Sequence, residues 1–205
     1  MKKIFINLPL FILLIITTPG CQQKGTKSMS NDNIEIATLA GGCFWCVEAV
    51  YERVEGVTDV ISGYAGGHLE EPTYKDVSRG DTGHAEVCQI FFDIKVINYD
   101  EILQVFWQAH DPTTLNRQGN DYGPQYRSAI YYHNEKQKTS AEAAIKDAEK
   151  MFEKPITTEV EQLKIFYEAE VYHQDYFRNN PNVPYCAFVI QPKIKKLKKQ
   201  GTIFD

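Results

Sequence analysis

Two closely spaced cysteines give this sequence its clearest chemical motif. The run Gly42-Cys43-Phe44-Trp45-Cys46 stands where a strand pattern gives way to a helical one. A thiol at a helix start faces unpaired backbone N–H groups, whose partial positive charge favours thiolate and lowers the thiol pKa. Cys46 lies one turn further on the same face, where it could attack an oxidised Cys43 and close a disulfide. The motif predicts a nucleophile with its resolving partner or, equally, a generic dithiol redox pair.

Three other kinds of site use similar residues. A thioredoxin-like disulfide oxidoreductase also has a Cys-x-x-Cys motif, but bulky Phe44 and Trp45 are unusual between its cysteines, and the flanking βαβ pattern here is not clean. A zinc site usually needs two paired ligand sets, whereas Cys88 and Cys186 are each isolated. A zinc deaminase would fit His84-Ala85-Glu86 but needs its Cys-x-x-Cys downstream, and here that motif lies upstream. The pattern favours reduction of an oxidised substrate by a cysteine.

Alternating strand and helix patterns must position this motif. We expect strands over residues 34–40, 57–64, 87–94, 128–133 and 156–163. We expect helices over residues 44–55, 100–109, 134–152 and 169–179, and a lysine-rich tail helix after an extended stretch at 181–190. Residues 65–84 and 110–126 are typical of long functional loops. The order of elements predicts one α+β domain, a two-layer α/β sandwich that begins near Ile34.

Composition narrows the class of protein further. The chain has 205 residues, of which 43% are hydrophobic and 24% charged, as in ordinary globular proteins. A formal net charge of -5 argues against general nucleic-acid binding, which needs a basic face. Twelve tyrosines among the aromatic residues suit a site for a small polar ligand.

The N-terminal residues resemble an export signal. Two lysines precede an apolar run over residues 4–16, which is too short to span a bilayer as a mature helix. The small residue before Cys21 resembles a bacterial lipoprotein cleavage box, so we expect residues 1–20 to be removed and Cys21 to carry lipid. Residues 21–33 would form a flexible tether between the membrane of the cell envelope and the domain at 34–205. An ordinary signal peptide or a retained N-terminal anchor is the alternative.

Further motifs make the chain, from about Ile34 to Lys199, similar to the peptide methionine sulfoxide reductase A family. Beside the paired cysteines they are Gly63-Tyr64-Ala65-Gly66-Gly67, Pro72-Thr73-Tyr74, Gly83-His84-Ala85-Glu86-Val87, His110-Asp111-Pro112-Thr113, and Asn120-Asp121-Tyr122-Gly123-Pro124-Gln125-Tyr126-Arg127-Ser128 followed by Ala129-Ile130-Tyr131. The resemblance implies a ferredoxin-like core at 34–205 with catalytic activity and no cofactor or metal. It also implies reduction of methionine-S-sulfoxide, in proteins and as the free amino acid, recycling by a thioredoxin-like reductant, and repair of oxidised proteins.

The residues of the paired-cysteine motif suit that chemistry. Reduction of a sulfoxide needs a thiolate, a proton donor to the oxygen and a pocket for the S-methyl group. Cys43 would attack sulfur, and Phe44 and Trp45 would form an apolar wall for the methyl group and favour positive charge on sulfur. The resemblance implies that Glu86 is the proton donor, which requires burial to raise its pKa. Cys43 would become a sulfenic acid, which Cys46 would resolve to a disulfide.

The resemblance also assigns residues outside that motif. Three are implied to bind the substrate: Tyr74, Asp121 and Tyr126. Many family members have Gly where Cys46 stands and keep resolving cysteines near the C-terminus, so Cys186 could be a second relay or a buried, inert thiol. Cys88 is expected in the core. We expect structural roles for three histidines: His84 and His110 as hydrogen-bonding groups, and His173 at a helix surface or in packing. A non-catalytic exported thiol or metal-binding module with the same fold is the rival function.

Overall fold

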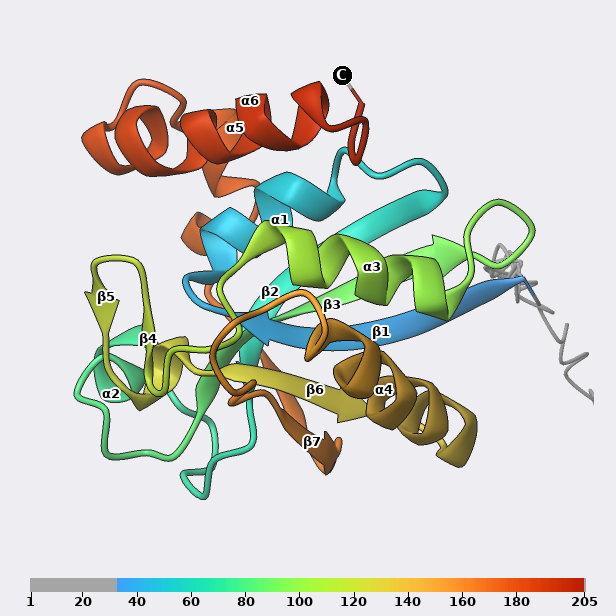
Figure 1. Ribbon diagram of the computed structural model, residues 1–205. Helices are drawn as coiled ribbons and strands as arrows, with labels where there is room; N and C mark the ends of the chain where they lie inside the picture. The colour runs from blue at the N-terminus through green and yellow to red at the C-terminus, as the bar shows by residue number, and fades with distance from the viewer. Residues whose placement is uncertain (1–32, 205) are drawn as a thin grey trace, which may run out of the picture. The chain divides into compact units, whose positions relative to one another are not determined.

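The computed structural model describes residues 33–204. The predicted signal segment, the predicted lipid-carrying Cys21 and all but the end of the predicted tether lie outside the described residues. The described part of the chain contains a sheet in the order β7-β6-β1-β3-β2-β8, in which every pair is antiparallel except the parallel pair β6–β7 (Figure 1). The strands have the bounds Ile34–Gly41 (β1), Val57–Ala65 (β2), Ala85–Asp93 (β3), Ser128–Tyr132 (β6), Glu159–Gln162 (β7) and Phe166–Glu168 (β8).

Helices cover one face of this sheet, as the sequence predicted for a mixed α/β domain (Figure 1). They are Phe44–Tyr51 (α1), Tyr99–Ala109 (α3) and Glu135–Ala148 (α4), and Gln191–Lys199 (α6) packs beyond α1. Asn98 and Asn134 start α3 and α4 by accepting hydrogen bonds from backbone N–H groups in the first turn. The cap residues therefore fix where each helix begins.

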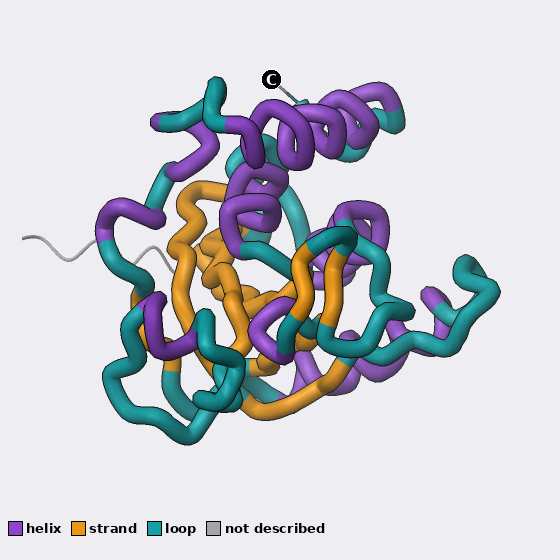
Figure 2. The backbone as a smooth tube through the Cα atoms, turned by 90° about the vertical axis from the view of Figure 1, so that its left-hand side faces the viewer, coloured by secondary structure: helices purple, strands orange, loops and turns teal. Residues whose placement is uncertain are grey.

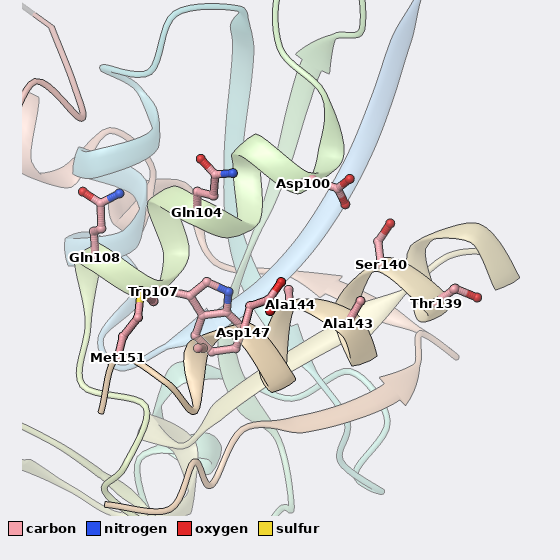
Figure 3. Close-up of a pocket in the computed structure, with 11 residues that line it drawn as sticks. Asp100, Gln104, Trp107, Gln108, Thr139, Ser140, Ala143, Ala144, Asp147 and Met151 are labelled. Carbon is pink, nitrogen blue, oxygen red and sulfur yellow. The ribbon is translucent and has the colours of Figure 1, made fainter. Parts of the chain in front are cut away.

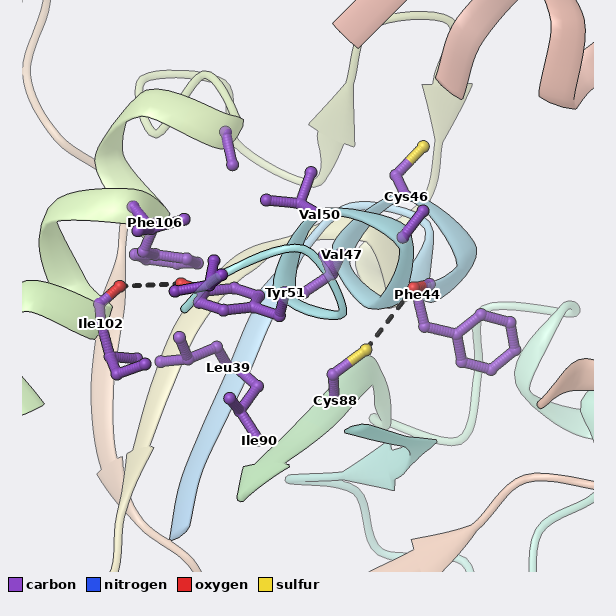
Figure 4. Packing of buried hydrophobic residues seen from close by; sticks show 14 of the residues in the cluster. Leu39, Phe44, Cys46, Val47, Val50, Tyr51, Cys88, Ile90, Ile102 and Phe106 are labelled. Atoms are coloured by element: carbon purple, nitrogen blue, oxygen red, sulfur yellow. Dashed lines mark hydrogen bonds between the residues drawn. The ribbon is translucent and has the colours of Figure 1, made fainter. Parts of the chain in front are cut away.

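The main core lies between α1, α3 and the sheet (Figure 4). The Tyr51 hydroxyl donates to the Ile102 carbonyl at 2.9 Å, which ties α1 to α3. Cys88 is fully buried, as predicted, and its thiol donates to the Phe44 carbonyl at 3.5 Å (Figure 4). Because α1 is buried on most of its surface, it holds the paired cysteines on a rigid support.

The register of β2 and β3 brings the predicted acid to the cysteines. Glu86 pairs with Tyr64 in the antiparallel ladder, near the end of the sheet where β1 finishes at Gly41. Side chains alternate between the two faces of a strand. Val87 therefore packs in a small cluster on the opposite face, whereas Glu86 shares a face with Cys88 beneath α1.

Several predicted elements differ from the structure. The first helix ends at Tyr51 instead of before Gly56. The predicted loops contain the short helix Tyr74–Val77 (α2) and a hairpin whose strands are Arg117–Gln118 (β4) and Asp121–Tyr122 (β5). Strand β8 was not predicted. A sequence pattern gives little warning of such short elements, because tertiary contacts decide them.

Two predictions in the C-terminal third are wrong. Residues 169–179 are not one helix but a 3₁₀ turn at Val171–His173 and a short helix at Tyr176–Asn179 (α5). Asp175 between them has a left-handed backbone (φ 52°), held because the buried Glu48 carboxylate accepts hydrogen bonds from the N–H groups of Asp175 and Tyr176. The stretch 181–190 is not extended throughout, because a π-helical turn at Cys186–Ile190 runs directly into α6.

Within residues 33–204, no helix is both long and apolar enough to cross a membrane.

Candidate active site

The paired cysteines lie at the end of the sheet where β1 passes into α1. Figure 2 views this end of the molecule, with the β4–β5 hairpin and short helices arranged around it. Gly42 has φ 94°, and a Cβ built there would lie 2.5 Å from Cγ of Gln118, so only glycine fits before Cys43. Cys43 is the N-cap residue of α1, and its side chain is 7% exposed. None of the four cysteines in the described part of the chain forms a disulfide.

Glu86 lies directly against the start of α1. Its Oε2 atom accepts a hydrogen bond from the Phe44 N–H at 3.0 Å, and the residue is 2% exposed. Burial raises the pKa of Glu86 to about 8, although the bonds from Phe44 and from the Cys43 thiol favour its charged form. Glu86 is therefore mainly protonated at neutral pH and can donate a proton beside Cys43.

The thiol of Cys43 does not have the lowered pKa that its helix position predicted. Burial, a hydrogen bond to Cys46 and the Glu86 charge raise the pKa of Cys43, because desolvation outweighs the favourable backbone charge. The hydrogen bond from Cys43 instead lowers the pKa of Cys46 to about 7. One of the two coupled thiols therefore loses its proton readily, so the pair can present a thiolate near neutral pH.

Aromatic rings form a wall beside the cysteines. The Phe44 ring stacks on Tyr74 with a centroid separation of 6.4 Å. Tyr74, at the start of α2, and Tyr126, which ends the 3₁₀ turn Pro124–Tyr126, have raised pKa values because they are partly buried and feel the charges of Glu86 and Cys43. Both phenols therefore remain hydrogen-bond donors next to the acid and the thiol.

Two residues outside the predicted set fix the position of Trp45. Its indole N–H donates to Nδ1 of His173 at 3.2 Å, and its ring stacks on Tyr176 at a centroid separation of 3.7 Å. His173 is 2% exposed, so of its two predicted places, a helix surface or packing, the second is confirmed. Burial lowers the pKa of His173, which keeps the ring neutral and Nδ1 able to accept. The adjacent aromatic residues Tyr172 and Tyr176 were a sequence signal of such packing.

Tyr185 is a further functional residue that the sequence did not predict. Its hydroxyl donates to Oδ2 of Asp121 at 2.6 Å and lies 3.6 Å from Sγ of Cys46. The structure thereby joins Asp121, on the β4–β5 hairpin, to the second cysteine through a residue of the C-terminal segment. In the run Pro184-Tyr185-Cys186, the sequence pointed to the cysteine. The residue that contacts the site is the tyrosine.

Glu170 stabilises the aromatic wall through Tyr64 and Tyr74. Its carboxylate accepts hydrogen bonds from the Tyr64 hydroxyl at 3.0 Å and from the Tyr74 N–H at 2.9 Å. Thr73 forms a capping box with Asp76 at the same helix start. These contacts hold α2 in place, which positions Tyr74 toward the cysteines.

The remaining predicted residues lie outside the reacting group. Cys186 is fully buried, and burial raises the pKa of its thiol. His84 bonds to the Gly67 N–H and the Leu69 carbonyl, and His110 bonds to the Phe106 carbonyl and the Ser128 hydroxyl, so both structural roles are confirmed. Among the residues that the structure describes, no group of three or more His, Cys, Asp and Glu side chains could hold a metal ion.

A cavity of about 680 Å³ lies elsewhere, between α3 and α4 (Figure 3). Trp107, Ala144 and Met151 line it together with amide, hydroxyl and carboxylate side chains. Its lining includes none of the predicted site residues. The chemistry of the paired cysteines is therefore separate from this cavity.

The site combines a shared thiolate, a protonated carboxyl group, two phenol donors and an aromatic wall. The eight residues predicted from the paired-cysteine motif and the resemblance all meet here: Cys43, Phe44, Trp45, Cys46, Tyr74, Glu86, Asp121 and Tyr126. Such an arrangement can attack an electrophilic sulfur and protonate the oxygen bound to it.

Comparisons with known proteins agree with this chemistry. A family described as "Peptide methionine sulfoxide reductase" matches residues 35–203. "Peptide methionine sulfoxide reductase MsrA" of Leptospira borgpetersenii is 60% identical over 82% of this chain and 96% of its own length. The reduced form of Mxr1 from Saccharomyces cerevisiae has a TM-score of 0.71 at 36% identity, covering 76% of this chain and 90% of that one. Mxr1 in complex with Trx2 has a TM-score of 0.51 at 26% identity, covering 74% of this chain and 91% of that one.

Proposed function

Because the chain belongs to the peptide methionine sulfoxide reductase family, we propose that its paired cysteines reduce methionine-S-sulfoxide by successive sulfenic acid and disulfide formation. The observation that carries this mechanism is the buried Glu86 carboxyl group, whose pKa burial raises to about 8, beside the buried Cys43 thiol. No other carboxyl group in the described residues has both that contact and a raised pKa. Reduction of the sulfoxide repairs oxidised proteins.

In the first step, the sulfur of Cys43 attacks the sulfoxide sulfur. Glu86 protonates the sulfoxide oxygen, with Tyr74 and Tyr126 as hydrogen-bond donors to it. The aromatic wall of Phe44 and Trp45 receives the methyl group and favours the positive charge that develops on sulfur. The oxygen passes to Cys43, methionine leaves, and Cys43 becomes a sulfenic acid.

In the second step, Cys46 attacks the sulfenic sulfur of Cys43. A disulfide forms, and the sulfenic oxygen leaves as water. The first turn of α1 brings the two cysteines together, since the Cys46 N–H donates to the Cys43 carbonyl at 3.0 Å. The short separation favours rapid closure of the disulfide.

Replacing Cys46 by serine separates the two steps. Without reductant, Cys46→Ser should form about one methionine per protein and keep Cys43 as a sulfenic acid that dimedone traps. Wild type should also release methionine but lose both thiols to the disulfide. Methionine release with thiol counting and mass spectrometry measures this outcome. Disulfide formation in Cys46→Ser, through another cysteine, would contradict the assignment of Cys46.

The same experiment tests the relay assigned to Cys186. If Cys186 takes over the disulfide from Cys46, wild type should release about two methionines per protein without reductant, because Cys43 becomes free again. Cys186→Ser should then release one. Equal release of one methionine from both proteins would leave Cys186 as a buried core thiol, in line with its complete burial.

A thioredoxin-like dithiol is the proposed reductant of the disulfide. The support is the family, and the structure of the related yeast Mxr1 in complex with Trx2. Paired thiols reduce a disulfide by exchange through a mixed disulfide. The reductant must be present in the compartment that holds this protein.

We also propose that the protein is an exported, membrane-anchored lipoprotein of the cell envelope. The support is the apolar N-terminal run and the small residue before Cys21. Full-length protein made in a bacterial host should partition with membranes and carry acyl chains on Cys21 in mass spectra. Cys21→Ser should lose the acyl mass while keeping the fold, since β1 begins at Ile34. Unmodified Cys21 in the membrane fraction would contradict lipidation.

A further inference from the structure

We propose that Tyr185 is a catalytic residue of the disulfide-forming step, taking the thiol proton of Cys46 while passing its own proton to Asp121. This inference rests on the proposed function, because it concerns the step after sulfoxide reduction. It adds a residue from the C-terminal segment whose hydroxyl bonds to Asp121 and lies 3.6 Å from Sγ of Cys46.

The bond to Asp121 sets the direction that we assign to the bond with Cys46. A phenol has one proton, and that of Tyr185 goes to Oδ2 of Asp121 at 2.6 Å. With its proton on that bond, the Tyr185 oxygen is left as an acceptor toward Cys46, so we assign the Cys46 thiol as the donor across 3.6 Å. A chain of hydrogen bonds thus runs from the thiol through the phenol to a carboxylate.

Other groups near Cys46 are less suited to receive its proton. The Cys43 thiol is its other hydrogen-bonding neighbour in the described residues, and in this step Cys43 is the sulfur under attack. Lys193 exerts its charge on Cys46 but is a cation and a donor. His173 is a neutral acceptor, but its Nδ1 atom is already bonded to Trp45. Tyr185 and Asp121 are the acceptor pair that the structure supplies.

The Tyr185 hydroxyl is held in place before the reaction. The ring meets Trp45 edge to face at a centroid separation of 5.9 Å, and the next residue, Cys186, is fully buried at the start of the π-helical turn. Burial and the neighbouring thiols raise the pKa of Tyr185. The phenol therefore passes a proton along rather than ionising itself.

The step balances without an outside oxidant. The Cys46 proton moves to the Tyr185 oxygen while the phenol proton moves to Asp121, which leaves a thiolate facing a phenol O–H. The thiolate forms the S–S bond as the S–O bond of Cys43 breaks. The electron pair of the S–O bond leaves with oxygen. Glu86, reprotonated from solvent, gives the proton that completes water. Cys46 is oxidised and the sulfenic sulfur is reduced by the same two electrons.

The test follows the two steps in one turnover of the full-length protein without reductant. Tyr185→Phe keeps the ring and removes the hydroxyl. Methionine release should stay within about twofold of wild type, while disulfide formation should slow by roughly 100-fold, the low end of general acid–base contributions. Dimedone-reactive sulfenic acid should accumulate on Cys43 between methionine release and disulfide formation. Quenched samples measured by mass spectrometry give both rates.

A matched control and a second variant make the outcome decisive. Tyr122→Phe alters an exposed phenol beside Asp121 and should match wild type in both steps. Asp121→Asn should slow disulfide formation, and Tyr185→Phe/Asp121→Asn should slow it no further than the slower single variant, because one relay is lost. Disulfide formation at the wild-type rate in Tyr185→Phe would overturn the proposal. Absence of methionine release from wild type would instead overturn the proposed function.

Discussion

Replacement of Cys43 by alanine is expected to reduce methionine formation by roughly 10⁴- to 10⁶-fold, the scale of losing a nucleophile. The reason is that Glu86, Tyr74 and Tyr126 surround Cys43, so an attack from any other thiol would lack the acid and the donors. Acidity alone would favour Cys46 as the attacking thiol, because its pKa is the lower of the two. The Cys43→Ala variant therefore distinguishes the two cysteines as nucleophile. Single-turnover release of methionine measures the loss.

Cys88→Ala is the matched control for Cys43→Ala. Cys88 is also a buried thiol, but it lies under α1 and bonds to the Phe44 carbonyl. Its loss should lower the free energy of unfolding by about 1–3 kcal/mol, as a small cavity and a lost hydrogen bond do, while leaving methionine release in place. Methionine release from Cys43→Ala at the wild-type rate, with none from Cys46→Ala, would exchange the roles of the paired cysteines.

Glu86→Gln should lower kcat by roughly 10²- to 10⁴-fold and remove the alkaline limb of its pH profile. A general acid must be protonated, so wild-type kcat should fall as pH rises through about 8, the pKa to which burial raises Glu86. Glutamine can still accept the hydrogen bond from the Phe44 N–H, so the fold should persist. Wild-type kcat in Glu86→Gln would contradict the role of the acid.

At alkaline pH, Glu86→Gln should raise stability although it lowers activity. The pKa of Glu86 in the folded state, about 8, exceeds the ordinary glutamate value of 4.5, so the folded state binds the proton more tightly than the unfolded state. Its contribution to stability is present below pH 4.5 and is lost as pH rises through about 8. At pH values above this range, Glu86→Gln should therefore melt at a higher temperature than wild type. Calorimetry across this pH range measures the difference.

Glu48→Gln distinguishes the two buried carboxyl groups of the site region. Burial also raises the pKa of Glu48, to about 7, so its ionisation falls in a neighbouring pH range. An amide there would turn a donor toward the N–H groups of Asp175 or Tyr176, so this variant should lose stability. The alkaline limb of kcat should remain in Glu48→Gln if Glu86 is the acid.

The sequence predicted the centre of the site because its residues lie in short, dense motifs. The helix after Gly42 placed both cysteines on one turn, and the strong strand pattern over 87–94 placed Glu86 near the start of a strand. The hydrogen bond between the Phe44 N–H and Glu86 then follows from strand register. Local patterns and the family resemblance were therefore enough for the nucleophile and the acid.

The C-terminal segment could not be predicted in the same way. His173 and Tyr185 reach the site because the buried Glu48 carboxylate fixes the turn at Asp175 and because a π-helical turn follows Tyr185. The turn at Asp175 depends on Glu48 of α1, more than a hundred residues earlier in the chain. The thiol pKa values likewise depend on burial, which the helix position alone does not give.

The most direct test of the whole account is turnover of the separated S- and R-epimers of a methionine sulfoxide peptide, with dithiothreitol as reductant. The proposed mechanism sets three directions around the sulfoxide sulfur: the methyl group toward Phe44 and Trp45, the oxygen toward Glu86, and the third side toward Cys43. Only one epimer can meet all three with its peptide chain directed outward. The account predicts reduction of the S-epimer alone. Equal reduction of both epimers, or of neither by well-folded protein, would contradict it.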